Sequence, residues 1–191
     1  MYKLYLDTTN KNLTVVISQD NTILAASSFV AWQKQTELAI DTINNLLIKC
    51  NLKLRDINEV VLANGPGSYT GIRVAITFVK TLKVLNPLLR IFIINSLFLQ
   101  VGMQKAISIL PAYNNKYYLA VYEDAKLIIK PQLVDINAKN GIINDLSSFK
   151  VVENFENVDI VSNFQLLSPY FIEVKAIAQL QPYYINDPFS F

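Results

Sequence analysis

The order of three segments between residues 57 and 85 is the feature that most constrains the fold of this chain. A short apolar segment is followed by the loop GPGSYTG, which holds three of the five glycines in 191 residues, and then by an amphipathic segment. A buried strand, a glycine turn and a helix in this order are typical of α/β folds, in which backbone N–H groups at the helix start can bind an anion.

The spacing of the glycines does not match the best-known phosphate loops. Gly65, Gly67 and Gly71 are one residue further apart than in the dinucleotide fingerprint, and the Lys-Ser/Thr ending of a P-loop is missing. The residues alone therefore favour a sharp strand-to-helix turn, in which Gly65 and Gly67 adopt unusual φ angles and Thr70 caps the helix.

The remaining pattern predicts two lobes. Alternating apolar residues over the first thirty positions, with a turn at Asp20-Asn21, predict a three-stranded antiparallel unit. Apolar residues three and four apart predict helices over 34–50 and 71–85. We expect further strands in RIFIINS, AISILPAY, KYYLAVYE and KLIIKP, and a division into a first lobe, residues 1–99, and a smaller second lobe, residues 100–191.

The composition excludes much chemistry. The chain has no histidine and one cysteine, Cys50, so it cannot form a Ser-His-Asp triad, a His metal site, an internal disulfide or a Cys-pair metal site. A net charge of +2 does not suggest a strongly basic nucleic-acid binder. Lys3 and Asp7 interrupt the amino terminus where a secretion signal is apolar, and no run is long enough to span a membrane, so we expect a cytoplasmic protein without membrane contact.

Both predicted helices carry more apolar residues than one sheet can cover. In the first, Leu46 and the two residues after it are all apolar and cannot share one face. In the second, Val74, Phe78 and Leu85 widen the apolar stripe to roughly 200°. Either the second lobe covers this excess, or Leu46, Val74, Phe78 and Leu85 form a partner interface centred on Phe78.

The nine residues GPGSYTGIR, preceded by an apolar strand and by LYLDTT at the amino terminus, resemble the TsaB (YeaZ) family of the actin-like superfamily, also called ASKHA or ribonuclease-H-like. The resemblance covers Met1 to about Leu99 and is faint afterwards, where Pro182 to Tyr184 match a closing Pro-x-Tyr element. It implies an α/β fold of two small lobes, each with a mixed sheet and helices. The matching loop residues are Gly65, Pro66, Gly67, Ser68, Tyr69, Thr70, Gly71 and Arg73.

The resemblance also implies a function without catalysis. Members of the family support the paralogous transferase TsaD, which places threonylcarbamoyl on an adenosine of tRNA (the t6A modification), and help to recruit the ATPase TsaE. For this chain it implies no catalytic residue, no metal, no cofactor bound by the chain alone, and contact with tRNA only through the complex. It leaves open a homodimer and a nucleotide at a shared interface.

Asp7 is the acid at a predicted strand end that could give the chain a catalytic role instead of a scaffold role. Related kinases and ATPases keep such an acid for metal and phosphate, but here it has no motif partner, and we expect a vestigial acid that caps its neighbours. The family's His-Thr pair is Gln35-Thr36 here, and its Asp-Ala-Arg element is replaced at residues 111–113. A small actin-like kinase or ATPase using Asp7 and the glycine loop, or a ribonuclease-H-like nuclease, remain the alternatives.

Overall fold

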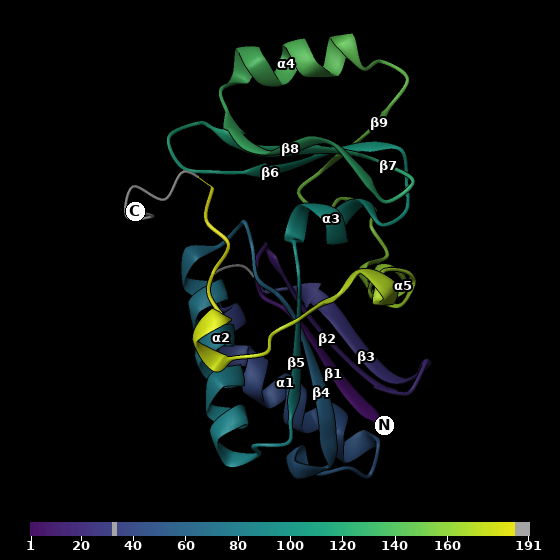
Figure 1. Ribbon diagram of the computed structural model, residues 1–191, viewed down its shortest axis with the longest axis vertical. Coiled ribbons are helices and arrows are strands. Elements are labelled where there is room, and N and C mark those ends of the chain that lie inside the picture. The colour runs from purple at the N-terminus through teal and green to yellow at the C-terminus, as the bar shows by residue number, and fades with distance from the viewer. Residues whose placement is uncertain (32–33, 186–191) are drawn as a thin grey trace.

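Two sheets stacked one above the other organise the chain (Figure 1). The structure is a computed structural model that describes residues 1–31 and 34–185. Within these residues the first sheet has six strands in the order β10-β5-β4-β1-β2-β3, and the second has four in the order β8-β7-β6-β9. The first sheet comprises β1 (Tyr2–Asp7), β2 (Asn12–Gln19), β3 (Thr22–Val30), β4 (Ile57–Ala63), β5 (Arg90–Ile94) and β10 (Ile172–Glu173). The second comprises β6 (Ala106–Pro111), β7 (Tyr117–Glu123), β8 (Lys126–Val134) and β9 (Lys150–Glu153).

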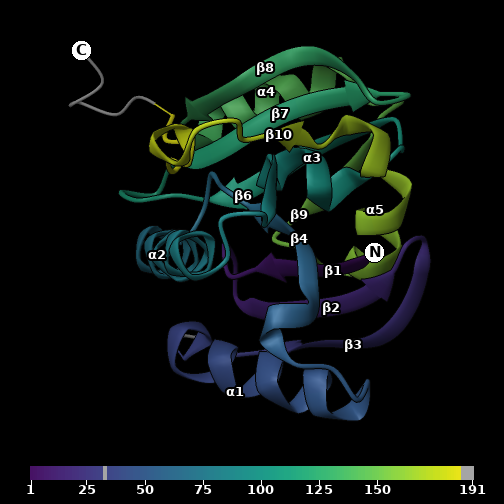
Figure 2. The same ribbon diagram turned by 60° about the horizontal axis from the view of Figure 1, so that its bottom comes forward.

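Helices fill the layers between and outside the sheets, as Figures 1 and 2 show from two sides. The helices α1 (Gln35–Lys49) and α2 (Tyr69–Leu85) pack on one face of the first sheet and form a first core with it. The helices α3 (Ser96–Val101) and α5 (Ile160–Leu166) lie between the sheets in a second core. The helix α4 (Ile136–Asp145) covers the outer face of the second sheet. Short 3-10 turns occupy Leu54–Asp56, Ser168–Tyr170 and Ile177–Gln179.

The period of two in the strand sequences explains why both faces of the first sheet are buried. In β1, Leu4 and Leu6 belong to the first core, while Tyr5 between them belongs to the second core. In β4, Val60 and Leu62 likewise face α1 and α2, and their neighbours face the second sheet. The mostly apolar β4 is therefore the buried parallel strand that the sequence predicts, and it pairs in parallel with β1 and β5.

Most predicted elements are confirmed, and the differences concern the start of α2 and the residue that caps it. The antiparallel unit β1-β2-β3 turns at Asp20, whose φ is +52°. The helix after the glycine loop begins at Tyr69, two residues before the prediction, because the Ser68 hydroxyl accepts the Gly71 N–H and acts as the N-cap. The prediction of Thr70 as the cap is wrong, since Thr70 already lies in the first turn of α2.

The segments near residue 99 bear on the predicted division into lobes, which stays a prediction. The helix α3 crosses residue 99 and packs between the two sheets. The strand β10, far along the chain, pairs with β5 at the edge of the first sheet. The carboxyl-terminal segment thus returns to the sheet that is formed mainly by the first hundred residues.

The glycines of the loop allow a close approach between backbones. Gly65 and Gly67 have φ angles of +111° and +152°, so the prediction of positive φ is confirmed. A Cβ atom on Gly67 would lie 2.1 Å from the Thr9 carbonyl oxygen, and one on Gly71 would lie 2.1 Å from that of Thr8. The loop therefore rests directly on the turn after β1, and no other residue type fits at either position.

We expect Gly67→Ala to lower the free energy of unfolding by about 1 kcal/mol or more, because the added methyl group meets a carbonyl oxygen and favours negative φ. Gly141→Ala is a matched control on α4, where a Cβ meets nothing within 4 Å. That change should raise stability by about 0.5–1 kcal/mol through helix propensity. Urea unfolding measures both, and equal midpoints for wild type and Gly67→Ala would contradict the packing described above.

Candidate functional site

The parallel strands β1, β4 and β5 end at the same edge of the first sheet, and the candidate site lies there. Polar residues follow each strand end: Asp7 closes β1, Asn64 follows β4, and Asn95 follows β5 and caps α3. In open α/β sheets this edge is where ligands bind, because loops and helix starts gather there. The glycine loop joins the same edge through the hydrogen bond from the Ser96 N–H to the Gly65 carbonyl, 2.8 Å long.

The Asp7 carboxylate is fully buried and holds the turn that follows it. Its two oxygens accept hydrogen bonds of 2.7 Å each, one from the Thr9 N–H and one from the Asn10 side-chain amide. Burial raises the pKa of Asp7 to about 6, although the hydrogen bonds from Thr9 and Asn10 act in the opposite direction. The expected capping of its neighbours is confirmed. Among the described residues, no three His, Cys, Asp or Glu side chains are grouped so that they could hold a metal ion.

The glycine loop and the turn after β1 bind each other. The Ser68 N–H donates to the Thr9 carbonyl over 2.6 Å, and the Thr8 hydroxyl donates to the Gly71 carbonyl over 2.8 Å. The Gly71 N–H donates to the Ser68 hydroxyl over 3.2 Å. Two N–H groups that could face an anion at the start of α2 are thus already used within the chain.

The predicted loop residues differ in their exposure. Tyr69 is 56% exposed, its ring stacks on that of Tyr184, and the Arg73 guanidinium lies over its face at 4.1 Å from the ring centre. Residues exposed at the surface can contact a ligand or a partner, whereas buried ones only shape the loop. Gly65, Pro66 and Gly71 are buried, Gly67 and Ser68 are half-buried, and Tyr69, Thr70 and Arg73 are exposed.

The predicted interface residues on the helices are only partly available. Leu46 is 3% exposed and belongs to the first core, so the prediction that it contacts a partner is wrong. The reason is the orientation of α1, which buries Leu46 and Leu47 together and leaves the third apolar neighbour, Ile48, 75% exposed. On α2, Val74 and Leu85 are 39% and 76% exposed, whereas Phe78 is half-buried against the first core.

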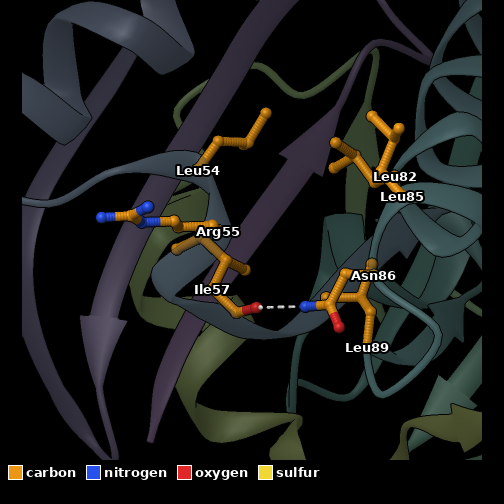
Figure 3. Close-up of a pocket in the computed structure, with 7 residues that line it drawn as sticks. All are labelled: Leu54, Arg55, Ile57, Leu82, Leu85, Asn86 and Leu89. Atoms are coloured by element: carbon orange, nitrogen blue, oxygen red, sulfur yellow. Dashed lines mark hydrogen bonds between the residues drawn. The ribbon is translucent and has the colours of Figure 1, made fainter.

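An apolar hollow of about 150 Å³ lies beside the end of α2, and the sequence pattern alone did not indicate it (Figure 3). Leu85, which is also part of the exposed stripe of α2, lines one side, and Asn86 closes the floor by donating to the Ile57 carbonyl at 3.5 Å. This volume suits one large apolar side chain and is below the range of small-molecule pockets. The lining residues are Leu54, Arg55, Ile57, Leu82, Leu85, Asn86 and Leu89.

The stacked mixed sheets with helices on their faces define the actin-like (ASKHA) class of α/β proteins. The solved structure of YeaZ from Pseudomonas aeruginosa superposes with a TM-score of 0.71 at 14% identity, over 96% of this chain and 99% of that one. A second structure, the crystal structure of a protein described as similar to peptidase YeaZ, gives a TM-score of 0.75 at 15% identity over the same shares. These likenesses establish the fold.

Sequence relatives define the family within this class. Residues 29–142 match the family model described as TsaD: tRNA N6-adenosine threonylcarbamoyltransferase. The chain is 32% identical to protein MG208 of Mycoplasma genitalium over 98% of its own length and 96% of that protein. It is 33% identical to the tRNA threonylcarbamoyladenosine biosynthesis protein TsaB of Bacillus subtilis over 79 residues, 41% of this chain and 34% of that one. The chain belongs to this family, in its TsaB (YeaZ) group.

No helix in residues 1–31 and 34–185 has the length and apolar character to cross a membrane.

The buried charge of Asp7 predicts a specific pH dependence of stability. Its pKa is about 6 in the folded chain and 3.8 for the free side chain, so the folded state binds more protons between these values. Relative to Asp7→Asn, the wild-type free energy of unfolding should therefore fall by up to about 3 kcal/mol as the pH rises from 4 to 7.

Urea unfolding across this pH range measures the difference. Asp124→Asn, at an exposed turn after β7, is the control for a lost carboxylate and should follow the wild type. A constant difference between wild type and Asp7→Asn from pH 4 to 7 would show that burial does not perturb Asp7.

Proposed function

We propose that this chain is the scaffold subunit of the t6A transfer machinery. It binds and supports the transferase TsaD, helps to recruit the ATPase TsaE, and meets tRNA through the complex. The observation that carries the proposal is membership of the TsaB group, together with the match of residues 29–142 to the family model named after TsaD. Because the matching family model is named after the transferase TsaD, this chain and TsaD are related proteins. This relation fits the proposal that the two pair with each other.

The outer face of the helix pair supports the partner role. Val84 and Leu85 are each 76% exposed at the end of α2, and Leu88 in the loop that follows is 89% exposed. The helices α1 and α2 already cover this face of the first sheet, and no element of the described chain packs over the side chains of Val84, Leu85 and Leu88. Apolar side chains gathered in this way typically mark a protein interface, and a stable one buries roughly 1,200–2,000 Å² in total. The hollow lined by Leu85 lies next to these residues and can accept an apolar side chain of the partner.

The closed edge of the first sheet supports a role without catalysis. An actin-like kinase needs backbone N–H groups of its phosphate loops for the nucleotide, but here the Ser68 and Gly71 N–H groups are bound within the chain. A ribonuclease-H-like nuclease needs several carboxylates around its metal ions, and Asp7 instead binds the turn that follows it. Both observations favour the scaffold over these alternatives.

Charge on the exposed stripe should prevent partner binding. We expect Leu85→Asp and Val74→Asp to weaken binding to the TsaD of the same organism at least about 100-fold, because each places an unpaired carboxylate in an apolar interface. Ile128→Asp is the matched control, since Ile128 is 50% exposed on β8 of the other sheet. Co-purification and titration measure the affinity, and circular dichroism checks the fold.

Phe78→Asp tests the predicted centre of the interface in the same assay. Because Phe78 is half-buried, this variant is informative only where its melting temperature matches the wild type. If Leu85→Asp, Val74→Asp and Phe78→Asp all bind TsaD as tightly as the wild type, the interface lies elsewhere. If they instead lose self-association, the same face forms a homodimer.

A chain without a catalytic acid should tolerate the loss of Asp7. In the reconstituted complex, we expect Asp7→Asn to reduce t6A formation less than about tenfold, a change of about 1.4 kcal/mol in the barrier. Labelled threonine incorporated into tRNA measures the rate, with TsaD binding checked in parallel. A loss of several hundredfold with binding intact would assign Asp7 a part in the chemistry.

A further inference from the structure

The last described residues, 174–185, form a strap that returns from the edge of the first sheet to the glycine loop (Figures 1 and 2). It begins where the Val174 N–H donates to the Ile91 carbonyl of β5, 2.8 Å away. Leu180 is fully buried in the first core, beside the helices α1 and α2. Ile185 packs against the second core, between the sheets. The strap therefore contacts both cores at the point where the candidate site lies.

The backbone of the strap covers the end of β4. The Tyr183 N–H donates to the Asn64 carbonyl over 2.8 Å, and the Asn64 side-chain amide donates to the Gln181 carbonyl over 3.5 Å. The Tyr183 carbonyl oxygen lies 2.9 Å from the place that a Cβ of Gly65 would take. Residues 181–185 thus lie directly on the first residues of the glycine loop.

Three side chains fasten the strap to the start of α2. The ring of Tyr184 stacks on that of Tyr69, with centres 5.6 Å apart and planes at 20°. The Arg73 Nε–H donates to the Tyr184 hydroxyl over 3.0 Å, and its guanidinium lies over the Tyr69 ring. We call Tyr69, Arg73 and Tyr184 the catch. All three lie near the surface, so water competes with their contacts.

The second core joins the two sheets, and buried hydrogen bonds fasten α3, which lies within that core, to the second sheet. Gln100 of α3 is fully buried and donates to the Ser108 hydroxyl of β6 and to the Val152 carbonyl of β9, over 2.7 and 3.0 Å. Its carbonyl oxygen accepts the Phe155 N–H over 2.6 Å. Separating the sheets would expose the second core, whereas residues 175–179 of the strap are already exposed. Local opening of the strap therefore costs less than separation of the lobes.

The edge beneath holds hydrogen-bonding groups that the described chain does not use. The hydroxyls of Thr9 and Ser96 are buried and have no partner among the described residues. Both residues adjoin the glycine loop, since the Thr9 carbonyl accepts the Ser68 N–H and the Ser96 N–H donates to the Gly65 carbonyl. Buried polar groups without partners are rare and mark places where a polar ligand gains hydrogen bonds.

We propose that residues 181–185 are a lid over the carboxyl edge of the first sheet, and that release of the Tyr69–Arg73–Tyr184 catch, not separation of the two lobes, gives access to the glycine loop. The proposal does not rest on the scaffold role, because it is argued only from contacts within the chain, and the proposed partner surface begins at Val74, next to Arg73 of the catch. It also assigns a structural role to the Pro-x-Tyr element at Pro182 to Tyr184.

Hydrogen–deuterium exchange on the full chain tests the lid. In Tyr184→Ala, we expect the Tyr183 amide and the loop amides in residues 65–70, where Pro66 has none, to exchange about tenfold faster or more, with those of α3 and β7 unchanged. Tyr184→Phe keeps the stacked ring but removes the acceptor for Arg73, so it should give an intermediate increase. Tyr113→Ala is the matched control, because Tyr113 is a tyrosine that is 53% exposed in the loop between β6 and β7 and lies outside the strap.

Two results would overturn the proposal. Unchanged exchange at residues 65–70 and Tyr183 in Tyr184→Ala would show that the catch does not hold the lid. An equal increase in α3 and β7 would show that the lobes separate instead. A second variant, shortened after Leu180, removes the lid altogether and should reproduce the fast exchange at residues 65–70 without affecting β7.

Discussion

The contact between the glycine loop and the turn after β1 is the constraint on which the rest of this structure depends. Gly67 and Gly71 bring the loop so close to the Thr9 and Thr8 carbonyls that a methyl group would overlap them. This contact sets the start of α2 against the end of β1. Since β1 and β4 are central strands of the first sheet, the direction of α2 across that sheet follows from the same contact.

The same contact explains why the edge has little remaining capacity for phosphate chemistry. In a phosphate loop the backbone N–H groups at the helix start point to the ligand. Here the loop and the turn hydrogen-bond to each other through the Ser68 N–H and the Thr8 hydroxyl, and the Asp7 carboxylate accepts the Thr9 N–H, which leaves the buried Thr9 hydroxyl without a partner among the described residues. In this architecture of the actin-like class, α1 and α2 lie in contact with each other on one face of the first sheet. Their inner faces form the first core, and the outer face of α2 remains available to a partner.

Stability and motion are divided between different parts of the molecule. The second core lies between the sheets and joins them, and the buried Gln100 network fastens α3 to the second sheet. The carboxyl-terminal strap is attached by one buried leucine, a few backbone hydrogen bonds and a surface cluster of aromatic rings. We therefore expect the strap to open near the glycine loop more readily than the two sheets separate.

Local pattern by itself determined the strands β1 to β8, the two long helices and the positive φ of Gly65 and Gly67, because alternation, helical spacing and glycine chemistry are properties of neighbouring residues. It did not indicate the short strands β9 and β10. The motif GPGSYTGIR also determined the family. Only the tertiary structure decided that Ser68 and not Thr70 caps α2 and that Leu46 is buried, because both depend on the rotation of a helix against the sheet. It alone also decided the strap, since the contacts of Tyr184 with Tyr69 and Arg73 join residues more than a hundred positions apart, and no local periodicity records such a pairing.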